Sequence, residues 1–447
     1  MKINEAVVTL KDPMIRDIIR LIKIPSIIEE NQSEKPFGNA IDDALKCALQ
    51  IAEELGFRTY YDPKGYYGYA EIGAGESLIG ILGHLDVVPE GDHANWTYPP
   101  FEGVLKDNKL YGRGTQDDKG PLVAALYAVK ALMDLQVDFN KRVRIIFGTD
   151  EENQWRGICR YMKEQEVPQF GFTPDSSFPV IFAEKGLLQI KLKSTKASPV
   201  TIRAGNALNT VPESAQIACN DYIKLEKTLK KNGFDYENDG DEIIVIGRNA
   251  HAAKPNLGIN AITRLVLALK EMGLKSPGID FLSDKIGLTN YGELIFGDCQ
   301  DEVSGKLTIN VGKIDFSKHG EVIGIDIRFP VTVSKTFIEN AIMRVAEKYN
   351  LIYDEFDYLK PNYMEKEHPS VAKLTQVYID ETGLDGTPLS TGGATYARAM
   401  KNCVAFGAIF PGQERVAHQV DEYMDLDFLI KAAQIYAKSI KALLDED

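Results

Sequence analysis

Residues 83–120 read GHLDVVPEGDHANWTYPPFEGVLKDNKLYGRGTQDDKG, and they lead from the end of a strand to the start of a helix. The preceding apolar run, residues 77–83, has the length and composition of a buried parallel strand. His84 and Asp86 follow it two positions apart, so both side chains point to one face. Ligands of open α/β sheets bind outside the carboxyl ends of the strands. We therefore expect the histidine and the acids of this segment to be metal ligands.

Three other interpretations of the segment involve no metal. A lone histidine at a strand end is more often a hydrogen-bonded structural residue than a ligand. Asp117 and Asp118 precede an amphipathic helix and could cap it. Gly112 and Gly114 suggest a dinucleotide-binding loop, but that fingerprint requires a third glycine where Asp117 stands. Further acidic and histidine positions downstream favour the metal site.

Composition excludes several functional classes. The 447 residues are 44% hydrophobic and 26% charged, as in an ordinary globular protein. The net charge of −14 argues against nucleic acid or an anionic membrane as a partner, and it is compatible with binding cations. No apolar run is long enough to span a bilayer, and no signal peptide is recognisable. The cysteines are odd in number and widely spaced, which predicts reduced thiols and a cytoplasmic protein: Cys47, Cys159, Cys219, Cys299 and Cys403.

The order of helix and strand patterns predicts two domains. Up to residue 186, helices alternate with strands that end in acidic residues, such as Val143–Phe147 before Asp150. Residues 187–358 contain strands of mixed polarity with helices near 213–229, 259–272 and 335–349. Residues 359–447 return to helices around one short strand. We expect an α/β domain (1–186 and 359–447) with a mostly parallel sheet and helices on both faces, and an inserted α+β domain (187–358).

Acids and histidines at the predicted strand ends form one group. Imidazoles and carboxylates without thiolates suit Zn²⁺ or a similar divalent ion. Two such ions about 3.5–4 Å apart, sharing a carboxylate, can polarise a carbonyl and generate hydroxide near neutral pH. Adjacent glutamates cannot point the same way from an extended backbone, so one could bind metal while the other accepts a proton. The group comprises His84, Asp86, Asp117, Glu151, Glu152, Asp175 and His418.

Several separated motifs resemble the aminoacylase/carboxypeptidase-like metallopeptidases, peptidase family M20. They are GHLDVVP at 83–89, GRGTQDDKG at 112–120, TDEE at 149–152, Pro174-Asp175, GRNAHAA at 247–253, and the distant His418. The resemblance covers nearly the whole chain. Tyr111, the long insertion and GGATYAR at 392–398 look most like the PepV-type dipeptidases within the family. The segment from His418 to Glu422 leads into no motif that we can match.

The resemblance implies a role for each residue of the metal site. His84 and Asp175 would bind one ion, Glu152 and His418 the other, and Asp117 would bridge both. Glu151 would be the general base. Asp86 would accept a hydrogen bond from His84 and fix its tautomer. The metals would be zinc, with manganese or cobalt as alternatives.

The inserted domain of this family acts as a lid, and the resemblance assigns it substrate contacts. His251 would help to stabilise the tetrahedral oxyanion. Arg328 would hold the substrate carboxylate, with a structural salt bridge as the alternative role. Asn209 would assist, with a turn role as its alternative, and Gly393 of the glycine-rich segment would contact substrate.

The sequence thus predicts a two-metal dipeptidase that cleaves unblocked dipeptides through a metal-bound hydroxide, and PepV-type relatives imply a monomer. An N-acyl-amino-acid or succinyl-diaminopimelate deacylase of the same family is the nearest alternative. A metal-free peptide-binding protein on a former hydrolase framework is a more remote one. Lid closure would bring His251 and Arg328 to the substrate.

Overall fold

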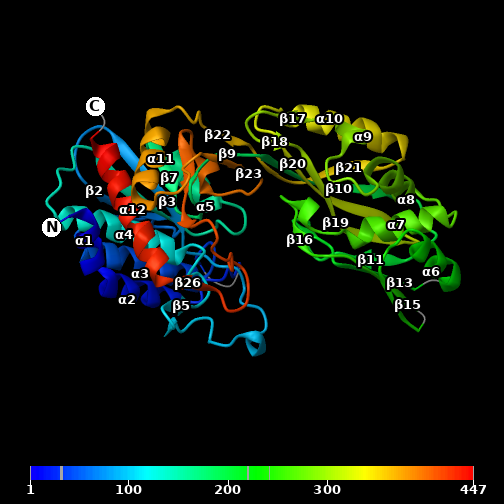
Figure 1. Ribbon diagram of the computed structural model, residues 1–447, viewed down its shortest axis with the longest axis horizontal. Coiled ribbons are helices and arrows are strands. Elements are labelled where there is room, and N and C mark those ends of the chain that lie inside the picture. Colours follow the sequence, from blue (N-terminus) through cyan, green and yellow to red (C-terminus); the bar gives the residue numbers. More distant parts are fainter. Residues whose placement is uncertain (1, 31–33, 219–220, 241, 446–447) are drawn as a thin grey trace. The chain divides into compact units, whose positions relative to one another are not determined.

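A computed structural model describes residues 2–30, 34–218, 221–240 and 242–445, and it divides into two compact units (Figure 1). Unit 1 comprises Met1–Phe182, Tyr363–Leu389 and Thr395–Asp447. Unit 2 comprises Ala183–Asn362 and Ser390–Ala394. The short segment Ser390–Ala394 therefore belongs with the inserted part, whereas the sequence pattern assigned it to the α/β part.

Unit 1 is built around one mixed sheet. The strand order is β1-β2-β6-β3-β7-β24-β9-β22, and β23 (Leu389–Thr391) also pairs with β9. The central pairs β6–β3, β3–β7 and β7–β24 are parallel, whereas β1–β2, β2–β6 and β24–β9 are antiparallel. The strands are β1 (Arg58–Tyr61), β2 (Gly68–Ile72), β3 (Leu78–His84), β6 (Arg142–Gly148), β7 (Phe170–Thr173), β9 (Val180–Glu184), β22 (Asn362–Tyr363) and β24 (Cys403–Phe406).

Helices pack against this sheet because its central strands are apolar on both faces, and the packing buries them. Every residue of β3 is buried, so the strand reads as an uninterrupted apolar run without alternation. Helix α4 contacts β3, α2 and α12, and α3 contacts β1 and β2. The helices are α1 (Ile3–Thr9), α2 (Lys11–Ile22), α3 (Asn39–Glu54), α4 (Lys119–Asp134), α5 (Arg156–Glu164), α11 (Pro369–Thr382) and α12 (Leu426–Leu444).

Short strands complete the loops of unit 1. Strand β26 pairs with β5, which also pairs with β4, and β25 pairs with β8 in parallel. The pairs β26–β5 and β25–β8 connect segments that lie far apart in the sequence, whereas β4 and β5 are neighbours along the chain. Their bounds are β4 (Val104–Lys106), β5 (Lys109–Tyr111), β8 (Ser176–Ser177), β25 (Ala408–Ile409) and β26 (Tyr423–Asp425).

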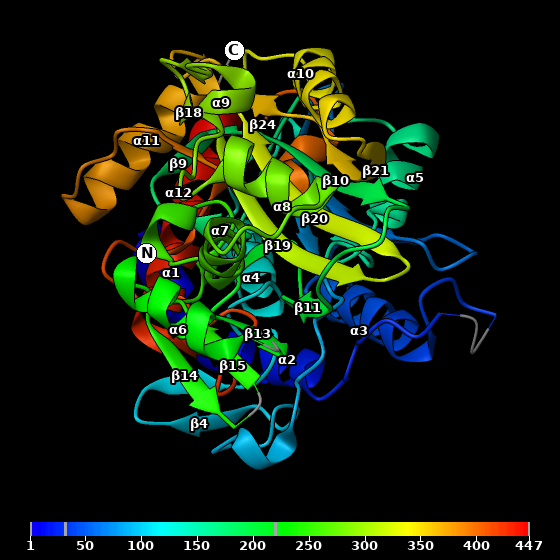
Figure 2. The ribbon, with the colours of Figure 1, turned by 90° about the vertical axis from the view of Figure 1, so that its right-hand side faces the viewer.

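Unit 2 has an antiparallel sheet of order β11-β19-β20-β10-β21. In Figure 2 the helices α7 and α8 lie in front of its strands, and they contact β19 and β20. Its bounds are β10 (Gly186–Ser194), β11 (Ile202–Ala204), β19 (Thr308–Ser317), β20 (Gly320–Phe329), β21 (Ile352–Leu359), α7 (Ala261–Glu271), α8 (Pro277–Phe281), α9 (Glu293–Phe296) and α10 (Lys335–Lys348). The expected α+β architecture is thus confirmed.

A second antiparallel sheet of unit 2 corrects one helix prediction. We expected a helix near 213–229, but Ser214–Ala218 forms β13, whose side chains alternate between exposed and buried. It pairs with β15 (Glu242–Ile246), which also pairs with β14 (Tyr236–Asp239). The helix α6 begins only at Tyr222 and ends at Lys231. Among the helices expected in residues 359–447 is one near 394–399, and this segment is a single 3-10 turn, η4 (Tyr396–Ala399).

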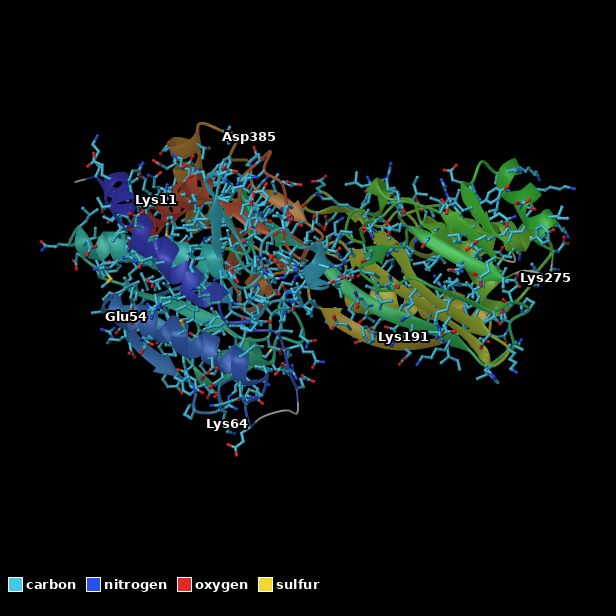
Figure 3. All side chains as sticks on the ribbon, turned by 90° about the horizontal axis from the view of Figure 1, so that it is seen from below. Lys11, Glu54, Lys64, Lys191, Lys275 and Asp385 are labelled. Atoms are coloured by element: carbon cyan, nitrogen blue, oxygen red, sulfur yellow. The ribbon has the colours of Figure 1, made fainter. Side chains whose placement is uncertain are left out.

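Charged side chains such as those of Glu54, Lys64 and Lys275 project from the surfaces of the units (Figure 3). Among the described residues, no helix combines the length and the apolar character needed to cross a membrane. The cysteines Cys47, Cys159, Cys299 and Cys403 are thiols, and Cys219 lies outside the described residues.

Candidate metal centre

The candidate metal ligands of unit 1 come from the ends of its central strands and from two loops. His84 is the last residue of β3, Asp175 follows β7, and Glu152 follows β6. Asp117 lies just before α4, and His418 lies between β25 and β26. The parallel pairing of β6, β3 and β7 brings their carboxyl ends to one edge of the sheet, where the topology of such folds places ligands.

Asp117 lies between the two histidines. His84 Nε2 is 3.0 Å from Asp117 Oδ1 and 3.6 Å from Asp175 Oδ2. His418 Nε2 is 3.2 Å from Asp117 Oδ2 and 2.8 Å from Glu152 Oε1. Each oxygen of Asp117 therefore faces a different histidine, and each histidine has a second carboxylate beside it.

Two overlapping groups have ligand atoms close enough together to hold a metal ion. They are His84, Asp117 and Glu152, and His84, Glu151 and Asp175, with ligand atoms within 4.8 Å of one another in each group. Glu151, which the resemblance implied as a base, thus lies close enough to be a ligand as well. The structure brings together all six acids and histidines that the sequence proposed as ligands or base.

Burial makes this collection of like charges unfavourable without a cation. Desolvation and the charge of Asp117 raise the pKa of Asp175 to about 7. Desolvation and Asp175 raise the pKa of Glu151 well above its usual range, and desolvation and Asp117 raise that of Glu152. Burial alone would lower the pKa of His418, but hydrogen bonds with Asp117 and Glu152 raise it to about 11. Without metal, protons on the imidazoles and carboxylates offset the repulsion between these acids. Divalent cations would offset the same repulsion when bound, so the residues present fit such ions.

The orientation of His84 depends on Asp86, but through a different atom than expected. His84 Nδ1 is 2.9 Å from the backbone carbonyl of Asp86, whereas the Asp86 carboxylate Oδ1 is 3.6 Å away. The carbonyl can only accept, so Nδ1 carries the proton and Nε2 is left to bind metal. The carboxylate of Asp86 instead accepts a hydrogen bond from the Glu152 backbone N–H at 3.0 Å.

A tyrosine that the sequence analysis did not select lies beside His84. The ring of Tyr396 meets the His84 ring edge-on at a centroid distance of 6.2 Å and the Trp155 ring at 5.4 Å. The Tyr396 side chain is fully buried, and Gly148 leaves the room for it, since a Cβ there would lie 2.3 Å from the ring. Tyr396 therefore restricts the imidazole from one side.

Glu422 holds the loop that carries Asp117, and the sequence analysis missed it. Its Oε1 accepts hydrogen bonds from the backbone N–H groups of Gly114 (3.0 Å), Gln116 (2.9 Å) and Asp117 (3.2 Å). Its Oε2 pairs with Arg113 at 2.6 Å. Glu422 is completely buried, so these bonds are the compensation for its desolvation.

Gln116 connects the same loop to the segment that carries His418. Its Oε1 accepts from the backbone N–H groups of Val416 (2.9 Å) and Ala417 (3.0 Å). Its Nε2 donates to the Glu414 carbonyl at 3.2 Å. His418 itself has a φ of 66°, which is uncommon for a residue other than glycine. The neighbouring hydrogen bonds hold the backbone in this conformation.

Arg328 of unit 2 forms the salt bridge that the sequence analysis weighed against substrate binding. Its Nε and Nη2 donate to the two oxygens of Asp326 at 2.7 and 2.9 Å, and its Nη1 donates to the Gly392 carbonyl at 2.9 Å. Since three of the five guanidinium N–H donors bond protein oxygens, at most two can reach a substrate. Arg328 thus anchors the glycine-rich segment that contains Gly393.

The other proposed substrate contacts of unit 2 are more exposed. His251 is exposed at the end of β16 (Ala250–His251), and its Nδ1 accepts from the Ala253 N–H at 3.1 Å. A neutral ring then carries its proton on Nε2, which is the donor that an oxyanion requires. Asn209 is exposed just before β12 (Thr210–Val211), and the Gly393 N–H donates to Thr391 Oγ1 at 3.0 Å.

Metal removal should make stability depend on pH in a defined direction. Asp175 keeps its proton up to about pH 7 in the folded state but loses it near pH 4 when unfolded, so its contribution to stability falls across that interval. Protonated His418, with a pKa near 11 against 6.5 unfolded, stabilises fully below pH 6.5 and progressively less above it. The Tm of the metal-free protein should therefore fall from pH 5 to pH 8.

Added Zn²⁺ or Mn²⁺ should raise the Tm more at pH 8 than at pH 5, because metal and protons compete for these ligands. Thermal unfolding after chelation and after metal addition measures both slopes. In the metal-free state Asp175→Asn should flatten the pH dependence. An equal metal-induced gain at both pH values would contradict a site made of these groups.

Glu422→Gln should weaken metal binding even though residue 422 is not a ligand. The amide keeps the shape but removes the charge opposite Arg113 and one acceptor atom, so the loop before α4 loses its fixed position. We expect a decrease in divalent-ion affinity of about 10- to 100-fold in calorimetric titration. The exposed Glu414→Gln is the matched control and should leave the affinity unchanged. A lower Tm with unchanged metal affinity would show that Glu422 is only structural.

Comparisons with known proteins identify the family and the fold. The model of the family described as "Peptidase family M20/M25/M40" matches residues 80–442. A protein of Bacillus subtilis (strain 168) named "Putative dipeptidase YtjP" is 37% identical over 461 residues, which cover 98% of both chains. Human carnosine dipeptidase 1 shares the fold with a TM-score of 0.64 at 14% identity, covering 100% of this chain and 98% of that one. Bacillus subtilis YXEP, described as a dinuclear metal binding peptidase, does so with a TM-score of 0.52 at 12% identity, covering 98% and 99%. The chain therefore belongs to peptidase family M20/M25/M40.

Proposed function

We propose that this protein is a dipeptidase that hydrolyses the peptide bond of unblocked dipeptides with the help of two divalent metal ions. The observation that carries the proposal is the position of Asp117, whose two oxygens face two different histidines, each beside another carboxylate. A single carboxylate shared by two such groups suits a pair of ions. The names of a Bacillus subtilis relative, "Putative dipeptidase YtjP", and of a structural neighbour, human carnosine dipeptidase 1, support the substrate class.

The ligand assignment follows the pairs in the geometry. His84 and Asp175 would hold one ion, His418 and Glu152 the other, and Asp117 both. Zinc fits this mixture of imidazole and carboxylate ligands, and manganese or cobalt would fit as well. When bound, the ions supply Lewis acidity and make a water molecule acidic enough to ionise near neutral pH.

Glu151 performs the proton transfers in this mechanism. It accepts a proton from the attacking water and then delivers it to the nitrogen of the leaving amino acid. Its half-buried carboxylate favours the protonated form, because desolvation and the charge of Asp175 raise its pKa well above the usual range. The same environment that makes Glu151 a basic carboxylate thus lets it hold a proton between the two steps.

Unit 2 acts as the lid and provides the remaining substrate contacts. His251 donates from Nε2 to the oxyanion, and Arg328 offers its remaining donors to the substrate carboxylate with help from Asn209. Gly393 brings backbone close to the substrate because it has no side chain. Lid movement admits the dipeptide and then excludes water. We further propose that the enzyme is monomeric and cytoplasmic.

A substrate panel tests the reaction class. With Zn²⁺, Mn²⁺ or Co²⁺ added, unblocked dipeptides should be hydrolysed with a higher kcat/KM than N-acetylated amino acids or N-succinyl-diaminopimelate. Release of free amino acids, followed by chromatography, measures this directly. Preference for the acylated compounds would instead identify a deacylase, and peptide binding without turnover would identify a binding protein.

Glu151→Gln should abolish most turnover without disturbing the ions. The amide cannot accept a proton, so kcat should fall by about 10²- to 10⁴-fold. Calorimetric titration should still find two bound ions per chain, because Glu151 is outside the proposed ligand set. Loss of one of the two ions would mean that Glu151 is a ligand, as its place in one of the two close groups would also permit.

A further inference from the structure

The segment that carries Asn209 rests directly on the backbone of β19. A Cβ on Gly312 of β19 would lie 2.5 Å from the Leu208 carbonyl oxygen and 2.6 Å from the Leu208 Cα. A Cβ on Gly205 would lie 1.9 Å from the Gly312 carbonyl oxygen, and Gly205 has a φ of +81°. No side chain fits between the two backbones, so the segment before Asn209 has a fixed distance from the strand.

The side chain of Asn310 fixes the same segment by hydrogen bonds. Its Nδ2 donates to the carbonyls of Leu208 at 3.1 Å and Thr210 at 2.9 Å, the residues on either side of Asn209. Asn310 is buried, with only 3% of its surface exposed. One amide group therefore sets the backbone direction on both sides of the exposed Asn209 side chain.

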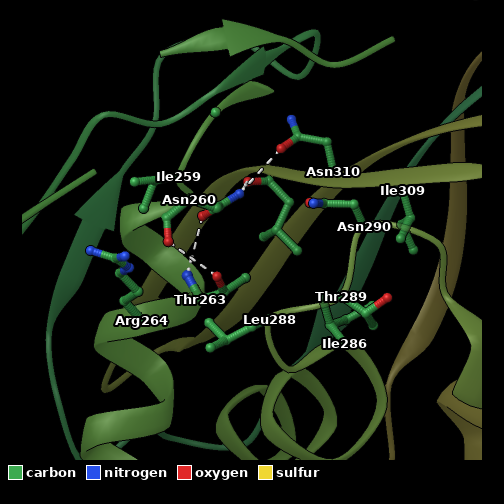
Figure 4. A pocket seen from close by; sticks show the side chains of 12 residues that line it. Ile259, Asn260, Thr263, Arg264, Ile286, Leu288, Thr289, Asn290, Ile309 and Asn310 are labelled. Carbon is green, nitrogen blue, oxygen red and sulfur yellow. Dashed lines mark hydrogen bonds between the residues drawn. The ribbon is translucent and has the colours of Figure 1, made fainter. Parts of the chain in front are cut away.

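Asn260 sets the orientation of the Asn310 amide. Its Nδ2 donates to Asn310 Oδ1 at 3.1 Å and to the Val311 carbonyl at 2.9 Å, and its Oδ1 accepts from the Thr263 N–H at 3.2 Å as the N-cap of α7 (Figure 4). Because Oδ1 of Asn310 accepts from Asn260, its NH₂ group must face Leu208 and Thr210. A cavity of about 170 Å³ borders both asparagines.

The same contacts extend to His251. Thr210 and His251 are directly opposite in the antiparallel pair β12–β16, and the Ala252 N–H donates to the Asn209 carbonyl at 2.8 Å. The pair β12–β16 has two residues in each strand and therefore few hydrogen bonds between its strands. A rotation of β12 would move β16 as well. Asn209 and His251 thus share one support, which begins at the first turn of α7 and passes through Asn260 and Asn310.

We propose that Asn310, oriented by Asn260, is a positioning residue that aligns Asn209 and His251 for the substrate. This inference rests on the proposed function, which gives those two residues their contacts with the dipeptide. Asn310 itself touches no substrate. It acts because a carboxamide can donate to two carbonyls while accepting from a third group, a combination that neither aspartate nor leucine offers.

Asn310→Asp is the sharpest test, since it keeps the shape and removes both donors. Two partly buried carbonyls lose their partners and face an acceptor, so kcat/KM for dipeptides should fall about 10- to 100-fold. Affinity for Zn²⁺ or Mn²⁺ should not change, because the proposed ligands lie in unit 1. Asn260→Asp keeps the cap to Thr263 but loses both donors, and it should shift kcat/KM in the same direction with an intact fold. It decides the question if Asn310→Asp does not fold.

Asn290→Ala is the matched control. Asn290 borders the same cavity but makes none of these bonds, so its removal should leave kcat/KM for dipeptides unchanged. A loss equal to that of Asn310→Asp would mean that any change around the cavity perturbs the lid, and it would overturn the specific role of Asn310.

A double-mutant cycle with Asn209→Ala separates positioning from a general structural effect. If Asn310 acts through Asn209, the fold-loss in kcat/KM of the double variant should be much smaller than the product of the two single losses. Independent structural effects should give that product, which is additivity in free energy. The loss in Asn310→Asp should also be larger for a dipeptide than for its C-terminal amide, because Asn209 assists in binding the carboxylate. Additive losses that are equal for both substrates would overturn the inference.

The outcomes also distinguish this inference from the proposed function. If Asn209→Ala and His251→Ala impair dipeptide hydrolysis while both Asn310→Asp and Asn260→Asp are normal, only the inference fails. If the wild-type protein does not cleave dipeptides, the proposed function and the inference fail together. If it cleaves them but Asn209→Ala and His251→Ala have no effect, the dipeptidase proposal stands, and the two lid contacts and the inference fail.

Discussion

The placement of Asp117 depends on its backbone. An aspartate side chain is short, so its two oxygens can face two histidines only if the Cα is held in one position. Glu422 holds it by accepting hydrogen bonds from the N–H groups of Gly114, Gln116 and Asp117. Arg113 neutralises the charge that this buries. Gln116 extends the support to the segment that carries His418. The geometry of the centre therefore depends on the buried side chains of Glu422, Arg113 and Gln116, which are not proposed as ligands.

Electrostatics explains why this support is needed. The carboxylates of Asp117, Glu151, Glu152 and Asp175 lie close together and repel one another. Desolvation first and this repulsion second raise the pKa values of Glu151, Glu152 and Asp175. A flexible site would respond by moving the acids apart, and the cation affinity would be lost. Strand ends and internally bonded loops resist this movement, so the energy stored in the repulsion becomes available for binding divalent ions.

The grouping of these residues could largely be predicted from the sequence, because an apolar run followed directly by acids or histidines marks the end of a buried strand. An apolar run followed by His84 and Asp86 locates the strand and the end at which acids and histidines gather. The motifs of family M20 point to Asp117 and Asp175, which the structure places beside His84. What the sequence could not show is pairing across distance. Glu422 lies about 300 residues from the N–H groups that it binds, and no local pattern marks it. The prediction of a helix near 213–229 is wrong at Ala215 and Ile217, which alternate with exposed neighbours in a strand, because a short apolar pattern suits both periods. The use of the Asp86 carbonyl rather than its carboxylate depends on backbone geometry that composition does not reveal.

Glu422 and Asn310 each fix the backbone of a loop, the first by accepting hydrogen bonds and the second by donating them. Glu422 is an acceptor that gathers N–H groups, whereas Asn310 is a donor that gathers carbonyls, and each is buried beneath a loop that exposes a functional side chain. A loop held only by its own turns would adopt several conformations of similar energy, and each would place Asp117 or Asn209 differently. A single buried side chain that bonds two or three backbone groups at once favours one of them, because any other conformation would leave those groups unsatisfied. The position of each functional side chain is therefore set by the buried residue beneath its loop. A substitution there should change metal binding or turnover without contacting metal or substrate.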